Sequence, residues 1–153
     1  ELFEDDAELV FITSDAQLLH FPASSVNPQG RGGSGVAGIK LAAKAHVVFF
    51  GAAPSNGAVV TVAEGDTTLP GTQSPMVKIT PLSAYPAKNR ATAGVRCHRF
   101  LKGSEQLEQA WAGPAPAIAA TASGSPLPLP ATDERRDGSG EPVQRTIGTI
   151  GTA

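Results

Sequence analysis

The short pattern Arg-x-x-x-Gly occurs three times in this chain, and no other feature restricts the possible folds as much. The copies run from Arg31 to Gly35, from Arg90 to Gly94 and from Arg136 to Gly140, so the pattern returns after 59 and then 46 residues. A unit that returns in this way indicates a repeat architecture. Because each copy places a cation ahead of a glycine turn, the repeats predict a shared surface that holds an anionic partner.

The residues around the first copy predict four short strands. Leu9–Thr13 and Leu18–Phe21 are rich in β-forming residues and flank a polar turn, which indicates a hairpin. Val36–Leu41 and Ala45–Phe50 are two further expected strands, and both follow the Arg loop. Four short strands per unit predict an all-β fold of propeller-like, four-stranded blades. The predicted units span about residues 8–53, 57–113 and 116–151.

The second and third units follow the same order with departures. A polar stretch from Asp66 to Pro75 lengthens the second hairpin and is expected to be a surface loop, and Val95–Phe100 is the next expected strand. Residues 105–112 could form a strand or one helical turn. Pro126–Pro130 predicts an edge strand, because proline cannot donate to a sheet ladder.

Cysteine usage and hydropathy restrict the cellular setting. Cys97 is the only cysteine, so no internal disulfide is possible and a reducing cytosol is expected. No apolar run approaches the roughly 18 residues of a membrane span. The sequence opens on Glu1 rather than methionine, and we expect a piece of a longer protein.

The net charge of −2 conceals a segregation of charge along the chain. Residues 1–15 hold six acids and no Lys or Arg, residues 16–104 hold nine Lys or Arg against two acids, and residues 105–153 hold six acids against three Arg. A basic middle segment between acidic ends favours an anionic partner. A solvated basic face with no partner explains the same charges equally well.

The first Arg loop reads Gln29-Gly30-Arg31-Gly32-Gly33-Ser34-Gly35. It resembles the box Gln-Arg-Arg-Gly-Gly-Lys-Gly of the A-type subunit of DNA gyrase, although Gly30 and Ser34 replace two cations of that box. The second loop, from Tyr85 to Val95, looks like the corresponding loop in a late blade of the same family. The resemblance extends over roughly residues 8–150 and is strongest over 8–100.

This resemblance implies the C-terminal domain of the A subunit of a bacterial type IIA DNA topoisomerase, either DNA gyrase or topoisomerase IV. In that family the domain is a β-pinwheel, and the three units would be its last three blades. The implied function is to bind, bend and wrap double-stranded DNA without reading its sequence, which supports an ATP-dependent change of DNA topology by the holoenzyme. The implied partners are double-stranded DNA, the ATPase B subunit of the holoenzyme and the remainder of the A subunit, in the bacterial cytoplasm at the nucleoid.

The loops supply the expected DNA contacts. Arg suits phosphate because its planar fork bonds bidentately, and neighbouring glycines let backbone N–H groups approach the anion. We expect Arg31, Arg90 and Arg136 to be equivalent phosphate contacts. The other loop cations are expected to widen the DNA-binding surface. The full expected set is Gln29, Arg31, Gly33, Lys40, Lys44, Lys88, Arg90, Arg96, Arg99, Arg135 and Arg136.

No catalytic residue, metal or cofactor is expected in this chain. Cys97 and His98 are neighbours on a predicted strand, so their side chains face opposite sides, and Cys97 is expected to be buried. The three histidines lack metal-ligand spacing, and no phosphate-binding ATP loop is present. Tyr85 does not match the motif of the family's DNA-cleaving tyrosine, which belongs to another domain together with its catalysis. A non-enzymatic β-repeat scaffold that binds an acidic protein is the alternative function.

Overall fold

The computed structural model describes residues 6–64 and 74–153 of the 153-residue chain. Residues 1–5 of the acidic N-terminal segment and most of the expected 66–75 surface loop lie outside the described residues. The described helices are two 3₁₀ turns, η1 (Ala23–Ser25) and η2 (Leu82–Ala84). The described strands are β1 (Glu8–Thr13), β2 (Gln17–Pro22), β3 (Val47–Ala53), β4 (Ala58–Ala63), β5 (Met76–Pro81), β6 (Val95–Arg96), β7 (Leu107–Gly113), β8 (Ala117–Ala120), β9 (Pro126–Leu127), β10 (Glu141–Pro142) and β11 (Thr149–Thr152).

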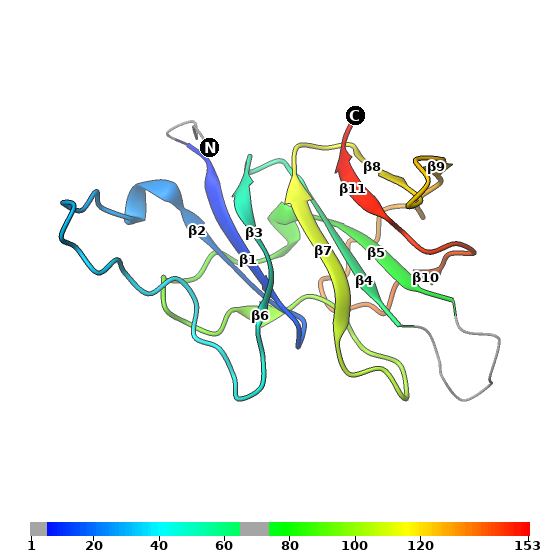
Figure 1. Cartoon of the computed structure of the whole chain (residues 1–153), viewed down its shortest axis with the longest axis horizontal. Coiled ribbons are helices and arrows are strands. Elements are labelled where there is room, and N and C mark those ends of the chain that lie inside the picture. The colour runs from blue at the N-terminus through cyan, green and yellow to red at the C-terminus, as the bar shows by residue number, and fades with distance from the viewer. Residues whose placement is uncertain (1–5, 65–73) are drawn as a thin grey trace.

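The strands form three antiparallel sheets that follow one another along the molecule (Figure 1). Their strand orders are β3-β1-β2-β6, β10-β5-β4-β7 and β11-β8-β9, and we call them the first, second and third sheets. The prediction of an all-β fold built from repeated blades is confirmed. The segment 105–112, which the sequence left open, is mainly strand β7, and β9 lies at a sheet edge as its prolines predicted.

In the first and second sheets, one edge strand comes from the next unit along the chain. β6, which follows the second Arg loop, pairs with β2 so that Val95 lies opposite Leu18 in the first sheet. β10, which follows the third Arg loop, pairs with β5 in the second sheet in the same way. The interpretation that each unit builds a whole blade from its own four strands is therefore wrong for the third strand in chain order, the one that follows the Arg loop. Successive units are joined by this exchange of strands.

The expected strand at Val36–Leu41 is absent, and the expected strand Val95–Phe100 is reduced to β6. The strand exchange gives the physical reason for the first difference. Segment 36–41 is the first-unit counterpart of β6 and β10, both of which pair with a hairpin of the preceding unit. The residues that the structure describes include no such hairpin ahead of the first unit, so segment 36–41 pairs with none among them.

Two of the repeated glycines are required by this junction. Gly94 and Gly140 have φ angles of +78° and +75°, a region that L-residues with side chains rarely adopt. A Cβ added at Gly94 would lie 2.3 Å from the carbonyl oxygen of Leu18, and one at Gly140 would lie 2.5 Å from that of Val77. The glycines that end the second and third copies of the pattern therefore allow one unit to approach the backbone of the unit before it.

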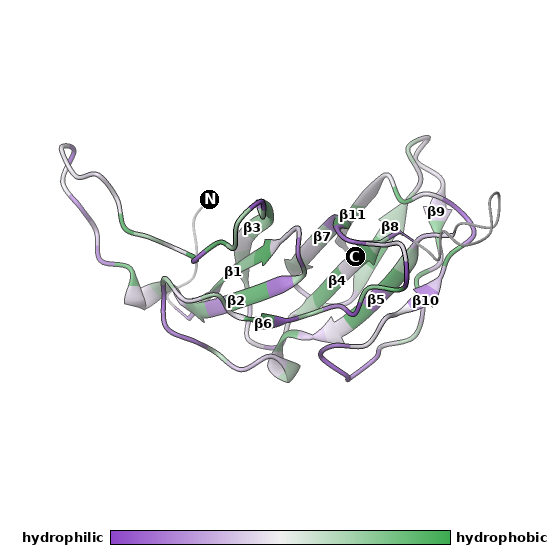
Figure 2. Ribbon diagram, turned by 90° about the horizontal axis from the view of Figure 1, so that it is seen from below, coloured by the Kyte–Doolittle hydropathy of each residue, from purple (hydrophilic) through white to green (hydrophobic). Residues whose placement is uncertain are grey.

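Apolar side chains pack between neighbouring sheets. The core between the first and second sheets contains Val10, Ile12 and Val59, and the core between the second and third contains Val60 and Val62. Full burial of each such side chain stabilises the fold by about 1.5–3 kcal/mol. Figure 2 shows hydrophobic residues concentrated on β1, β4 and β5, whereas much of the hydrophilic colouring lies on the connecting loops.

Candidate nucleic-acid interface

The Arg loops of successive units are bonded to one another. The backbone N–H of Lys40, beyond the first Arg loop, donates to the carbonyl of Thr92 at 2.9 Å. The N–H of Arg99, beyond the second loop, donates to the carbonyl of Gly138 at 3.0 Å. The two bonds join matching positions, because Lys40 and Arg99 are 59 residues apart and Thr92 and Gly138 are 46 apart. The loops therefore lie in series along the molecule.

The first loop projects from the edge of the molecule (Figure 1). Its expected contacts Gln29, Arg31 and Gly33 are all exposed, and a turn is closed by the bond from the Gly33 N–H to the Gly30 carbonyl at 2.9 Å. In the described part of the chain, no hydrogen bond or ion pair joins Arg31 to the second loop. The exposed cations Lys40 and Lys44 follow on the segment that leads to β3.

Arg90 in the second loop is bonded to the first loop. Its side chain is half-buried, and its guanidinium Nη1 donates to the carbonyl of Ala37 at 2.7 Å. The next residue adds a backbone bond, from the Ala91 N–H to the Gly38 carbonyl at 2.7 Å. Because a guanidinium carries five N–H donors, Arg90 can hold the first loop and still offer donors to an anion. Lys88 in the same loop is exposed.

Acids accompany the cations of the third loop. The guanidinium of Arg135 forms an ion pair with Asp133 at 3.0 Å, and its hydrogen bonds lower the pKa of that carboxyl. Arg96, which lies beyond the second loop, forms an ion pair with Asp137 at 3.3 Å and lowers the pKa of its carboxyl. Arg136 is exposed between these acids. Two of the expected DNA contacts, Arg96 and Arg135, therefore already have anionic partners within the protein.

Sequence reasoning missed a buried lysine beneath these loops. Lys78 on β5 is 1% exposed, and its ammonium donates to the hydroxyl of Tyr85 at 3.1 Å and to the carbonyls of Cys97 at 3.2 Å and Arg136 at 2.9 Å. It also donates to the hydroxyl of Thr80. Burial lowers the pKa of Lys78 to about 8. The available signal was a lysine between Val77 and Ile79, in the middle of an apolar strand.

Tyr85, Cys97 and His98 are all buried. Tyr85 is 2% exposed and burial raises its pKa, while burial raises the pKa of the Cys97 thiol to about 12. The expectation of a buried Cys97 is confirmed. The ring Nδ1 of His98 lies 2.9 Å from the hydroxyl of Thr61, and burial is the main cause that lowers the pKa of His98 to about 4. These groups therefore serve packing and hydrogen bonding.

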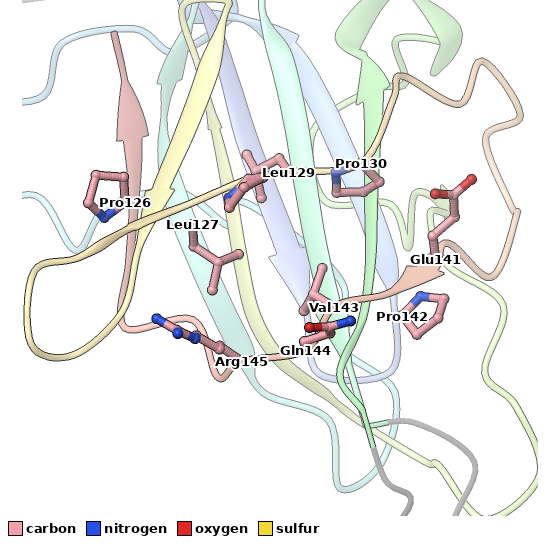
Figure 3. A pocket seen from close by; sticks show the side chains of 10 residues that line it. Pro126, Leu127, Leu129, Pro130, Glu141, Pro142, Val143, Gln144 and Arg145 are labelled. Carbon is pink, nitrogen blue, oxygen red and sulfur yellow. The ribbon is translucent and has the colours of Figure 1, made fainter.

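Metal-binding clusters and membrane-spanning helices are both absent from the described residues, 6–64 and 74–153. In them, no three His, Cys, Asp or Glu side chains gather to hold a metal ion. Their helices include none that is long and apolar enough to cross a membrane. A pocket of about 350 Å³ lies beside β9, lined mainly by proline and leucine, with Glu141 and Arg145 as its charged residues (Figure 3).

Sheets that exchange strands in series, with glycine turns at each junction, define a propeller-like class of repeat domain. Residues 7–54 and 72–107 match the family described as "DNA gyrase C-terminal domain, beta-propeller". Because the match covers more than half of the residues, the chain belongs to this family.

Two curated relatives have similar sequences. The chain is 38% identical over 99 residues to "Topoisomerase subunit TopoM" of Mycolicibacterium smegmatis, a match that covers 65% of this chain and 13% of the relative. It is 33% identical over 95 residues to the DNA gyrase A protein of Salmonella typhimurium, covering 62% of this chain and 10% of the relative. The matched region is thus about a tenth of the length of these relatives.

Solved structures share the fold. The C-terminal domain of DNA topoisomerase IV superposes with a TM-score of 0.71 at 20% identity, covering 98% of this chain and 47% of that one. The E. coli ParC C-terminal domain gives a TM-score of 0.70 at 14% identity, covering 99% of this chain and 62% of that one. At these identities the likeness establishes the fold alone.

Proposed function

We propose that this domain binds double-stranded DNA along its Arg loops, through phosphate contacts that do not read the base sequence. The proposal rests on one observation: the basic loops of the first two units contain no acids and are hydrogen-bonded to one another. Residues 26–46 contain three Lys or Arg and residues 85–100 contain four, and neither segment contains an acid. The bond between Lys40 and Thr92 holds these two segments against one another.

The chemistry of this surface fits a phosphate backbone. Duplex DNA carries one negative charge per roughly 1.7 Å of its axis, so cations spaced along an edge release counterions when the duplex binds. Arginine and lysine contacts of this kind position the duplex and carry no base information. A series of blades places its loops at successive intervals, which favours a bent path for the bound DNA.

In the whole protein, the domain would bend and wrap DNA for a type IIA topoisomerase. The partners in this proposal are double-stranded DNA, an ATPase B subunit in the holoenzyme and the rest of the A subunit, in the bacterial cytoplasm. The chemistry of strand cleavage and ATP hydrolysis would belong to those other parts, and the domain itself would need no cofactor. Both DNA gyrase and topoisomerase IV are consistent with the proposal.

Salt-dependent binding tests this function. Fluorescence anisotropy with unrelated duplexes of about 40 base pairs should give similar affinities that fall as salt rises, with a log–log slope of about −0.9 for each phosphate neutralised. Strong preference for one sequence would contradict phosphate-only contacts. No salt-dependent binding to any duplex, together with binding to an acidic protein, would favour the alternative scaffold function.

A further inference from the structure

We propose that Lys40, Arg99 and Arg145 form a second row of phosphate contacts, with one cation from each unit. This inference rests on the proposed binding of duplex DNA and names further side chains of that surface. From the sequence, Lys40 and Arg99 were expected only as additions to the contacts of the Arg loops, and Arg145 was not among the expected contacts. We call these three residues the Lys40 row.

The repeat spacing relates the three members. Lys40 and Arg99 are 59 residues apart, and Arg99 and Arg145 are 46 apart, which are the same two spacings that relate the three Arg-x-x-x-Gly copies. A cation therefore recurs at a second fixed position in every unit.

The backbone places Arg99 and Arg145 alike. Two residues before Arg99, the Cys97 N–H donates to the carbonyl of Ala16 at 2.8 Å. Two residues before Arg145, the Val143 N–H donates to the carbonyl of Pro75 at 2.9 Å. Ala16 and Pro75 each lie just before the second strand of a hairpin, so both arginines follow a segment fixed to the unit before it.

The backbone also places Lys40 and Arg99 alike, because each donates its N–H to the next Arg loop, as described above. Arg99 thus shares one kind of backbone hydrogen bond with Lys40 and another kind with Arg145. The row is held in place at both kinds of junction between units.

The side chains of the row face solvent. Ile39 packs against the apolar cluster on the outer face of the first sheet, and His98 is 1% exposed. Since neighbouring side chains of an extended chain point to opposite sides, Lys40 and Arg99 face outward, and both are exposed. Arg145 is also exposed, and its side chain is visible beside the pocket in Figure 3.

The cations of the Lys40 row are also not paired with acids among the described residues. The ion pairs among the described residues join His20 to Glu8, Arg96 to Asp137 and Arg135 to Asp133, and none uses a member of the row. A phosphate that approaches these three cations therefore displaces no acid within the described part of the chain. By contrast, a phosphate at Arg96 or Arg135 would compete with a carboxylate.

The test compares two substitutions of equal charge in the 153-residue chain. Arg145→Gln removes the newly assigned member of the row. Lys102→Gln is the matched control, because Lys102 is exposed on the turn after Arg99 and has alanine and glycine at the matching positions, Ala43 and Gly148, in the other units. Duplex affinity is measured by anisotropy at several salt concentrations, with chemical denaturation as a check on folding.

We expect Arg145→Gln to flatten the log–log salt slope by about 0.9, and Gln at all three positions of the row to flatten it by about 2.7. Arg145→Lys should restore most of the lost slope, and Lys102→Gln should leave it nearly unchanged. Equal changes of the salt slope for Arg145→Gln and Lys102→Gln would show that binding depends on overall positive charge, and would overturn the proposed Lys40 row. A wild-type chain without salt-dependent binding would instead overturn the proposed function, and the row with it.

Discussion

The first and second units have corresponding sheet faces that carry opposite kinds of side chain, apolar in the first unit and polar in the second. Pro22 and Pro81 lead into the two 3₁₀ turns and align the units, so Leu19 in the first unit corresponds to Lys78 in the second. In the first unit, Leu19 and Phe21 are buried in an apolar cluster. In the second, Lys78 is buried among hydroxyl and carbonyl oxygens.

The difference shows two ways of covering the same surface. The apolar cluster stabilises the first unit by removing hydrocarbon from water, and it makes no directional bond to another unit. Lys78 loses hydration on burial, but its hydrogen bonds fix the carbonyls of Cys97 and Arg136, which lie on different loops. The polar face therefore positions the loops, and its stability should depend on pH.

The largest expected effect comes from exchanging the two kinds of face. Leu19→Lys would bury an ammonium among Leu9, Phe21 and neighbouring apolar side chains. We expect a loss of about 3–5 kcal/mol in the free energy of unfolding, the range seen when a buried charge lacks compensation. Urea denaturation measures it. Leu19→Met is the control and should cost under about 1.5 kcal/mol; equal losses for both variants would contradict the comparison.

A pH effect should arise from His98 on the polar face. Its pKa is about 4 in the folded chain, lowered from 6.5 by burial and then by the charge of Lys78. Between these pH values the unfolded chain binds a proton that the folded chain does not, so stability falls as the pH drops from 6.5 to 4. The contribution is about 3 kcal/mol at most.

Denaturation of the wild type and His98→Asn at several pH values isolates this effect, because other titrating groups are common to both chains. The stability advantage of the wild type should shrink between pH 6.5 and pH 4. An advantage that stays constant over this range would show that His98 takes up its proton without cost in the folded chain.

Removal of the buried ammonium should have a smaller effect. Lys78→Met keeps the aliphatic stem but leaves the Cys97 and Arg136 carbonyls without this donor. We expect a loss of about 2 kcal/mol, within the range for a buried polar group left unpaired. Hydrogen exchange should also quicken at the backbone amides near Arg136. Unchanged exchange there would mean that Lys78 does not position the third loop.

Much of the fold was predictable because its signals are local. The run Leu9–Thr13 is dense in β-branched and aromatic residues, as strands are, and the structure places β1 there. Segment 36–41 has a strand-like composition but pairs with no hairpin among the described residues. Composition near a segment cannot reveal a partner that another unit must supply, so the exchange of strands was missed.

The candidate site was predictable only as a set of cations. The repeated glycines located the loops, and the same spacing would have found Arg145 had it been extended past Gly140, which ends the third copy. The bonds that alter each cation's role join residues far apart: Arg90 reaches Ala37 across 53 positions, and Arg96 reaches Asp137 across 41. Those pairings depend on how the units dock.

The smallest expected effect separates two arginines that the sequence treats as equal. Arg90 donates a charge-assisted bond to the Ala37 carbonyl at 2.7 Å, whereas Arg31 is exposed and has no such bond to the second loop among the described residues. Arg90→Ala should therefore cost about 1 kcal/mol of stability, and Arg31→Ala almost none. If both arginines also contact phosphate, each variant should flatten the log–log salt slope by about 0.9, and the pair by about 1.8.

Arg90→Lys sharpens this last comparison, because it keeps the charge but loses the planar fork that can serve a carbonyl and a phosphate together. The variant should retain the salt slope of the wild type while losing part of the stability. If Arg90→Ala weakens DNA binding with no change in slope, Arg90 acts by holding the first loop in place. The phosphate contact would then belong to Arg31 alone, and the two positions would have separate roles in successive units.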